Sequence, residues 1–406
     1  MDTSMLSRIG RHIESISDDL RAISLDIHAH PELKFKERHA HHLLTTYLRQ
    51  QSGWQVTSPA YGMDTAFVAS FEGRSSGATV SFNAEYDALP GIGHACGHNL
   101  IAVVSLAAAL AAAKIVHDDG LPGRVMIFGT PGEEGGGGKI KLLKAGAYQD
   151  VDVSMISHPG VTPDAALVHT AAYAEIHVEY FGKAAHAAAA PWEGVNALDA
   201  LILTINNISA SRQQNQPGDI IQYKITNGGE KPNIIHAYAS GQFVLRAPSL
   251  ERLSRLMDKF LACVEGAAMA TAAKYRTVEG LGYLDHVSNQ ALGIRYGQHF
   301  GALGGHIDGP AITQASTDQG DISHAMPSIS PFFWIRSETE DGAQLGGPHT
   351  PDFEKAARTT EAHELALRVA KALAATAVDV LSSSDLLKEV KREFQDMKRI
   401  GITARP

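Results

Sequence analysis

The stretch Ala84-Glu-Tyr-Asp-Ala-Leu-Pro-Gly-Ile-Gly-His-Ala-Cys-Gly-His-Asn99 gathers several potential metal ligands in one short, glycine-rich loop. These ligands are Glu85, Asp87, His94, Cys96 and His98. Apolar runs at 78–83 and 100–116 flank the loop and predict a buried strand before it and a buried helix after it. A strand-to-helix turn that carries thiolate, imidazole and carboxylate groups is typical of a metal centre.

The composition sets limits on class and location. With 406 residues, the chain is long enough for two domains, and 44% hydrophobic with 19% charged residues is typical of a globular protein. A formal charge of −9 argues against nucleic acid or an anionic membrane as the main partner. Two cysteines cannot form a disulfide framework, and residues 1–10 lack the apolar core of a signal peptide. We therefore expect a cytoplasmic protein, with the apolar run 100–113 as a core helix and not a membrane span.

Strands and helices alternate through the first part of the chain. The patterns predict helices at 5–28, 34–50, 99–116 and 138–146, and strands at 64–71, 78–84, 124–130 and 151–157. This alternation predicts an α/β fold with a mostly parallel sheet. Ligands collect beyond the carboxyl ends of such strands, where this chain places Glu85–His98, Glu133-Glu134 and His158. These distant clusters are expected to converge at one edge of the sheet.

A different pattern follows near residue 170. It predicts strands at 172–181, 219–226, 234–246 and 274–284, and helices at 195–210 and 249–266. This β-α-β-β-α-β order is the ferredoxin-like split motif. We expect it to form an inserted domain at 171–286, within a larger domain made of 1–170 and 287–406 that ends in a helix at 359–382.

The residues around Cys96 have both a functional and a structural explanation. If Asn99 caps a helix that begins at Leu100, the helix N-terminus favours a Cys96 thiolate. A small buried cysteine in a tight turn is the alternative. Asp87 is placed to accept a hydrogen bond from a ligating imidazole and so to fix its tautomer. For His94, which has no partner at a ligand spacing, a hydrogen bond that orders the loop is expected.

The second polar stretch is Gly129-Thr-Pro-Gly-Glu-Glu-Gly-Gly-Gly-Gly138. Neighbouring side chains after a strand point in different directions, so one of Glu133 and Glu134 can bind a metal while the other moves a proton. A solvated acidic turn is the alternative, which the glycines that follow disfavour, because they permit close backbone approach. A phosphate-binding loop is excluded, because Glu133 stands where the first glycine is needed and Ile140 replaces the Ser or Thr.

Three further histidines remain open on sequence alone. His158 precedes Pro-Gly and His349 lies in Gly346-Gly-Pro-His-Thr-Pro351, and each by itself is better explained as a structural histidine. His186 lies among alanines that are too small to fill a core around it. That setting points to close approach by another molecule.

Taken together, these segments resemble peptidase family M20, the aminoacylase/carboxypeptidase metallopeptidases, and especially the dipeptidases of its amidohydrolase branch. The resemblance rests on residues 84–99, 129–139, 157–159, 182–200, 227–235, 245–248, 316–318 and 349–350. It implies a zinc-peptidase-like catalytic domain with a mostly parallel central sheet. It also implies that the inserted ferredoxin-like α+β domain serves dimerisation or acts as a lid.

The resemblance also implies roles for individual residues. The implied metal ligands are Cys96, His98, Glu134, His158 and His349, and Glu133 is the implied general base. His186 is the histidine that one subunit of a homodimer offers to its neighbour's active site. Asn233 and Arg246 are the implied substrate-binding pair, with Arg246 contacting a carboxylate in bidentate fashion. The family's His-x-Asp motif reads Glu85-Tyr86-Asp87 here, so Asp87 is kept while the histidine is not.

The implied activity is hydrolysis of the amide bond of a dipeptide or an N-acyl amino acid. The implied cofactor is a divalent metal, two per subunit, as Zn²⁺, Mn²⁺ or Co²⁺. One alternative is an amidohydrolase for N-aroyl or N-acyl amino acids, of the p-aminobenzoyl-glutamate or hippurate type. Another is a catalytically silent member of the family that binds amino-acid-like ligands. Such a protein would lack the base or a ligand, and neither is missing from this sequence.

Overall fold

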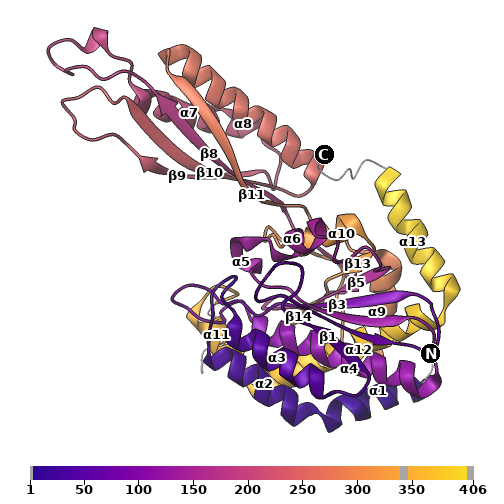
Figure 1. Cartoon of the computed structure of the whole chain (residues 1–406). Coiled ribbons are helices and arrows are strands. Elements are labelled where there is room, and N and C mark those ends of the chain that lie inside the picture. The colour runs from indigo at the N-terminus through magenta and orange to yellow at the C-terminus, as the bar shows by residue number, and fades with distance from the viewer. Residues whose placement is uncertain (1–2, 339–345, 400–406) are drawn as a thin grey trace. The chain divides into compact units, whose positions relative to one another are not determined.

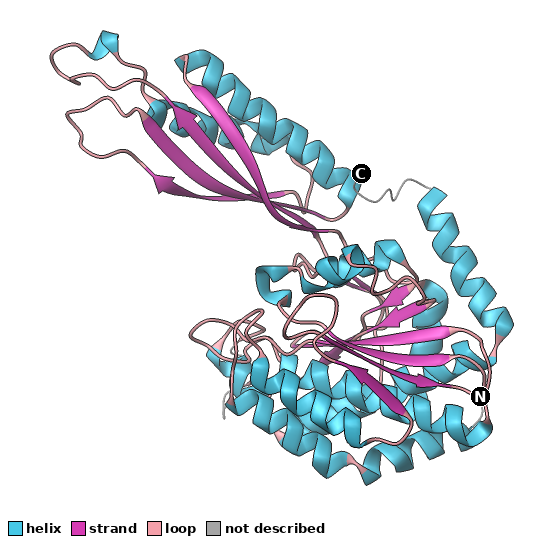
Figure 2. Ribbon diagram, viewed as in Figure 1, coloured by secondary structure: helices cyan, strands magenta, loops and turns pink. Residues whose placement is uncertain are grey.

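The computed structural model describes residues 3–338 and 346–399 (Figures 1 and 2). The chain forms two compact units. Unit 2 consists of Thr170–Asp285 and Thr313–Thr317, and unit 1 contains the other described residues. The sequence led us to expect an inserted domain at 171–286. The segment Thr313–Thr317, which returns to unit 2 from a distant part of the chain, was not expected to belong to it.

Unit 1 is built around a sheet whose described strands have the order β1-β2-β4-β3-β5-β13. Strands β4, β3, β5 and β13 run parallel, while β1 and β2 add an antiparallel edge. The bounds are β1 Trp54–Thr57, β2 Phe67–Glu72, β3 Thr79–Ala84, β4 Arg124–Gly129, β5 Val153–Met155 and β13 Ser328–Ile329. The predicted α/β class with a mostly parallel sheet is confirmed.

Two short parallel pairs complete the strands of unit 1. They are β6 (His158–Gly160) with β14 (Phe332–Trp334), and β7 (Val168–His169) with β12 (Ala311–Ile312). The helices are α1 Thr3–Ser15, α2 Ser17–Ala29, α3 Arg38–Gln50, α4 His98–Asp119, α5 Glu133–Gly136, α6 Gly138–Lys144, α9 Gln290–Ala302, α10 Gln319–Ala325, α11 Pro351–Ala356, α12 Thr360–Ser382 and α13 Ser384–Arg399.

The sheet is covered on both faces. On β4, Val125 and Ile127 join the main core with α4 and α12, whereas Met126 and Phe128 join a second cluster with α6 and α10. This alternation is the period of two that a strand buried on both sides requires. By length and composition α4 could span a membrane, but 89% of its apolar window is buried inside the protein, so it is the predicted core helix.

Several predicted elements differ in their bounds. The helix expected at 5–28 is divided into α1 and α2 at Ile16. The helix expected at 34–50 begins only at Arg38, because Phe35 has a φ of +60°, which is outside the helical region. The strand expected at 151–157 ends at Met155, where pairing with the central sheet stops. His158 instead begins β6 and pairs with Phe332 of β14.

Unit 2 has the predicted ferredoxin-like fold. Its order is β8 (Ala172–Phe181), α7 (Ala197–Ser211), β9 (Ile220–Asn227), β10 (Tyr238–Ala247), α8 (Leu250–Thr271) and β11 (Lys274–Tyr283), with short 3₁₀ turns at Pro191–Glu193 and Arg212–Gln214. The sheet is antiparallel with the order β11-β8-β10-β9. Alternate residues of β8 and β10 are buried in a separate core with α7 and α8.

Candidate metal centre

Three neighbouring segments of unit 1 carry four of the five predicted ligands, all except His349. Strand β3 ends at Ala84 and leads into the loop of Asp87, Cys96 and His98. Parallel to it, β4 ends at Gly129 and leads to Glu133 and Glu134. On the other side of β3, β5 leads on to β6, which begins with His158. The carboxyl ends of these parallel strands therefore meet at one edge of the sheet.

The start of α4 aims Cys96 and His98 toward this edge. Between them Gly97 has a φ of +78°, and a Cβ there would lie 2.6 Å from Cγ of Pro159. Only glycine fits that position without strain. The expected cap was wrong: α4 begins at His98, and the Asn99 side chain donates hydrogen bonds to Oγ of Ser24 and to the Ala357 carbonyl.

The five predicted ligands lie in two overlapping groups that share Cys96. In the first, Cys96, His98 and His158 bring ligand atoms within 4.8 Å of one another, with Sγ of Cys96 3.3 Å from Nε2 of His158. In the second, Cys96 meets Glu134 and His349 within the same limit, and Glu134 Oε1 lies 3.2 Å from His349 Nε2. A thiol, three imidazoles and a carboxylate form a donor set that suits Zn²⁺ and similar divalent ions.

Asp87 contacts a member of each donor group, His98 in the first and Glu134 in the second. Its Oδ1 lies 3.1 Å from Nδ1 of His98, and its Oδ2 accepts a hydrogen bond of 2.9 Å from the Glu134 amide. Although burial opposes it, these hydrogen bonds lower the pKa of Asp87 below its usual value. The contact with Nδ1 leaves Nε2 of His98 for a metal. That atom is buried and has no hydrogen-bond partner among the described residues, as expected of a ligand atom.

The ionisation of Cys96 differs from the sequence-based expectation. Burial raises the pKa of its thiol above the ordinary value, so the N-terminus of α4 alone does not produce a thiolate. The positive charge of a divalent ion would favour the thiolate instead. His349, the most exposed of the five predicted ligands, adopts a φ of +72°, and its amide donates to the Ala95 carbonyl at 2.8 Å. A non-glycine residue held in that region is often found at a functional site.

Glu133 lies directly beside the ligands. It is buried, and its Oε2 is 3.9 Å from Nε2 of His98. Burial, followed by the negative charges of Glu85 and Glu134, raises its pKa well above the ordinary value. A carboxylate with a raised pKa next to ligand atoms is suited to accept and return a proton.

A buried ion-pair network next to Glu133 was not predicted. The ammonium of Lys139 is fully buried, donates to Glu85, and lies 2.6 Å from Oδ1 of Asp318. The free oxygen of Glu85 lies 3.5 Å from Nε2 of His98. Glu85 stands two residues before Asp87. In an extended segment this spacing predicts that the two side chains point to the same side of the chain. No local pattern predicts that Lys139 pairs with carboxylates. Its pairing with carboxylates agrees with the exclusion of a phosphate loop.

The other predicted site residues belong to unit 2. His186 is exposed, and its Nδ1 accepts hydrogen bonds from the amides of Ala188 and Ala189 at 3.2 and 3.1 Å. Asn233 lies on a neighbouring segment, where its carbonyl accepts from the Ala187 amide at 3.0 Å. Arg246 lies apart from that loop, on β10.

The Arg246 guanidinium is held in place before any ligand binds. It lies 4.8 Å from the centre of the Tyr173 ring and donates to Oγ of Ser316 at 2.8 Å and to the Gln314 carbonyl at 3.1 Å. Burial lowers its pKa, although not enough to change its charge near neutral pH. An oriented, permanently charged guanidinium is well suited to bind a carboxylate.

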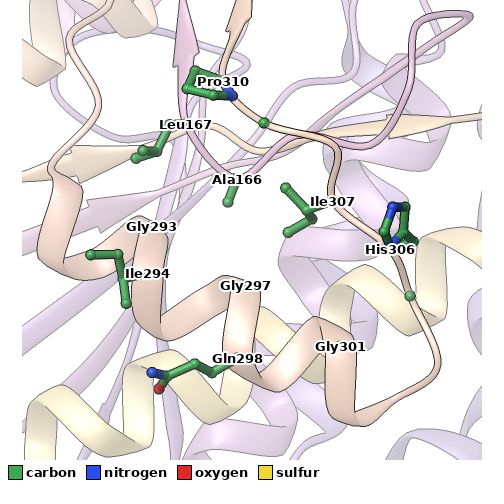
Figure 3. A pocket seen from close by; sticks show the side chains of 12 residues that line it. Ala166, Leu167, Gly293, Ile294, Gly297, Gln298, Gly301, His306, Ile307 and Pro310 are labelled. Carbon is green, nitrogen blue, oxygen red and sulfur yellow. The ribbon is translucent and has the colours of Figure 1, made fainter.

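A separate pocket of about 470 Å³ lies beside α9 in unit 1 (Figure 3). Its wall includes the glycine face of α9 and the apolar side chains of Leu167, Ile294 and Ile307. None of the predicted ligands lines it. It offers few polar groups, so it is not the site of the chemistry.

Comparisons with known proteins agree with the fold and with a metal-dependent hydrolase. The sequence profile described as "Peptidase family M20/M25/M40" matches residues 81–218, and that of the "Peptidase dimerisation domain" matches residues 168–271. The human Xaa-Arg dipeptidase is 40% identical, over 94% of this chain and 90% of that protein. A p-aminobenzoyl-glutamate hydrolase subunit from Escherichia coli is 30% identical, over 91% and 90% respectively.

Solved structures show the same fold. A putative aminohydrolase from methicillin-resistant Staphylococcus aureus has a TM-score of 0.77 at 17% identity, covering 94% of this chain and all of that one. A Bacillus subtilis protein described as a dinuclear metal-binding peptidase of the M20 family has a TM-score of 0.69 at 18% identity, covering 91% and 99%. With the sequence relatives, these findings show that the chain belongs to peptidase family M20, a family of hydrolases that depend on divalent metals.

Proposed function

We propose that this protein hydrolyses the amide bond of dipeptides with a basic C-terminal residue. The observation that carries this proposal is the pair of donor groups sharing Cys96, with Glu133 beside them. The substrate class is supported by the 40% identity to a protein named Xaa-Arg dipeptidase. A formal charge of −9 also favours attraction of a cationic substrate.

The proposed ligands are those of the two donor groups: Cys96, His98, Glu134, His158 and His349. These two donor groups, which have Cys96 in common, would hold two divalent ions. Zn²⁺ is the first choice because the thiolate and imidazoles dominate, with Mn²⁺ and Co²⁺ as alternatives. When bound, such an ion supplies Lewis acidity that polarises the amide carbonyl and lowers the pKa of a water molecule.

The side chains of the chain itself perform the proton transfers. Glu133 takes a proton from the attacking water and returns it to the leaving amine. Asp87 keeps His98 in the tautomer that leaves Nε2 for the metal. Arg246 and Asn233 are proposed to hold the substrate, with the Arg246 guanidinium on its carboxylate.

His186 is proposed to act across a homodimer. Because its Nδ1 accepts backbone hydrogen bonds, the proton of the neutral ring is on Nε2, which is then able to donate. A donor aimed at the developing oxyanion typically contributes about 3 kcal/mol. The match to a peptidase dimerisation domain supports the homodimer.

Two cysteines without a disulfide, Cys96 and Cys263, support the expected cytoplasmic location.

Hydrolysis of N-aroyl amino acids is the second candidate, because a p-aminobenzoyl-glutamate hydrolase subunit is 30% identical over most of the chain. The two candidate activities are distinguished by comparing the rates of hydrolysis of dipeptides that end in Arg, Lys or Glu with the rates for p-aminobenzoyl-glutamate and hippurate. Each assay is run with Zn²⁺, Mn²⁺ and Co²⁺. We expect the highest kcat/KM for dipeptides ending in Arg or Lys. A preference for the aroyl substrates would replace the first proposal by the second.

The chemistry is tested by variants of the base and of the ligands. Glu133→Gln should bind as much metal as the wild type and lose about 10²- to 10⁴-fold in kcat. The double variant Cys96→Ala/His98→Ala should lose metal, measured by elemental analysis of purified protein. Substantial turnover by Glu133→Gln, or full metal content in the double variant, would contradict the assignment.

A further inference from the structure

The segment directly before α3, residues 34–37, contacts the turn that carries Glu133 and Glu134. We call residues 34–37 the brace and Gly132–Gly136 the base turn. At one end of the contact, Nζ of Lys34 donates to the Gly135 carbonyl at 2.8 Å. At the other end, Oε1 of Glu37 accepts from the Gly132 amide at 2.8 Å. The brace therefore contacts the backbone of the base turn on both sides of the two glutamates.

The ring of Phe35 fills the space between these two contacts. A Cβ at Gly132 would lie 2.8 Å from Phe35 Cζ, and one at Gly136 would lie 2.7 Å from Phe35 Cε2. Nζ of Lys141 on α6 lies 3.8 Å from the ring centre. The ring thus packs directly on the backbone of the base turn, which only glycine permits at these positions.

Within the brace, Glu37 has the largest free-energy cost of burial, because it is a buried carboxyl group. Its side chain is fully buried, and burial raises its pKa to about 7. Its Oε1 accepts from the amides of Phe35 and Gly132, and its Oε2 accepts from Oγ1 of Thr65, all at 2.8 Å. The carboxyl group therefore joins the brace, the base turn and the Thr65 segment at one point.

We infer that Glu37 is a positioning residue, whose side chain holds the Gly132 amide and thereby the backbone from which Glu133 projects. The inference rests on the proposed role of Glu133 as the base. A proton-transfer group works only within hydrogen-bond reach of its substrate, so a small displacement of its backbone lowers the rate. The contact with the Gly132 amide therefore requires the length of the Glu37 side chain and not its negative charge.

Two variants of Glu37 separate reach from charge. Glu37→Gln keeps the length, and its oxygen still accepts from both amides while its NH₂ group donates to Thr65 Oγ1. Glu37→Asp keeps the charge but withdraws the carboxylate by one methylene. We expect kcat near the wild-type value in Glu37→Gln and a loss of about tenfold to a hundredfold in Glu37→Asp. KM and bound metal should stay within about twofold in both, since Glu37 itself is not a ligand and four of the five proposed ligands lie outside the base turn.

A matched control is Glu32→Ala. The Glu32 carboxylate accepts from the amides of His39 and Ala40 at the start of the same helix, α3, and takes part in none of the hydrogen bonds described above for the base turn. This variant should lower the melting temperature without lowering kcat. Amide hydrogen exchange gives a readout that is independent of activity: exchange at 132–136 should accelerate in Glu37→Asp and not in Glu32→Ala.

The inference is overturned if folded Glu37→Asp keeps the wild-type kcat and exchange rates. It is also overturned if Glu37→Gln loses as much activity as Glu37→Asp, which would indicate a role of charge, or if Glu32→Ala loses as much. Failure of the proposed function has a different signature, because Glu133→Gln would then keep its turnover while the exchange data remained as expected.

Discussion

The resemblance to peptidase family M20 predicted the ligands Cys96, His98, Glu134, His158 and His349, whereas His158 and His349 by themselves were better explained as structural histidines. The structure brings all five into two overlapping groups. Contacts among other residues of the site were not predicted. Asp318 meets Lys139 across 179 positions of the chain, and Glu37 meets Gly132 across 95. Lys139, Asp318 and Gly132 lie in segments that carry the family resemblance, but which residues meet depends on the loops that the fold brings together.

The buried histidine His363 contributes to the sensitivity of unit 1 to acid. His363 on α12 is 4% exposed, and burial together with the charge of Arg21 lowers its pKa to about 4. In the unfolded chain the ring protonates near pH 6.5, so below that pH the unfolded state binds more protons. The contribution to stability is therefore present above about pH 6.5 and lost as the pH falls toward about 4.

We expect His363→Gln to reduce this dependence. Between about pH 7.5 and about pH 5.5, wild-type protein should lose roughly 1 kcal/mol more in its free energy of unfolding than the variant. Urea unfolding at the two pH values measures the difference. His42→Gln, at an exposed position on α3, should follow the wild type. Equal losses in wild type and His363→Gln would show that His363 is not responsible.

At the scale of single elements, apolar periodicity predicted most helices and strands, while their ends depended on contacts that the pattern does not contain. Helix α4 was predicted because an apolar run of that length must be buried. Its start was misplaced by two residues, because Gly97 and not Asn99 occupies the cap position. The helix expected from residue 34 starts at Arg38, since the brace is held by Gly132 and Gly135.

The start of α4 offers a test with a matched pair of glycines. Gly91 and Gly97 lie in the same loop with φ of +79° and +78°, but a Cβ on Gly91 meets nothing within 4 Å, whereas one on Gly97 meets Pro159 at 2.6 Å. Gly91→Ala should cost about 1 kcal/mol of stability from backbone strain alone. Gly97→Ala should cost more and reduce bound metal, because it displaces Cys96 and His98.

Differential scanning calorimetry and elemental analysis check this prediction. It is wrong if both glycine variants lose the same stability and keep the same metal content. In that case the contact with Pro159 would not be what orients the two ligands.

For the whole molecule, the alternation of patterns predicted an α/β unit and a ferredoxin-like unit, and both are present. In unit 2, β9 is an edge strand that exposes Tyr223 and Ile225. An exposed edge with apolar side chains is a surface for pairing with another chain. Together with the dimerisation-domain match, this supports a homodimer. The proposal that His186 serves the partner's site remains to be tested within that dimer.

Mixing two inactive variants tests that arrangement. If His186 acts across the dimer, a subunit with His186→Ala still has Glu133 and receives His186 from a Glu133→Gln partner. Refolding or subunit exchange of an equal mixture should then restore about a quarter of the wild-type rate, since half of the dimers are mixed and each has one complete site. No recovery, with mixed dimers verified by mass spectrometry, would mean that His186 acts within its own subunit.

The amino-acid sequence by itself determined the class of fold, the two units and the residue types of the metal centre. These follow from local periodicity and from the rule that ligands gather at the carboxyl ends of parallel strands. Only the tertiary structure decided which ligands share Cys96, how Lys139 is buried between two carboxylates, and how Glu37 reaches the base turn. Those contacts join segments far apart in the chain, and their energies depend on burial and distance, which no local pattern records.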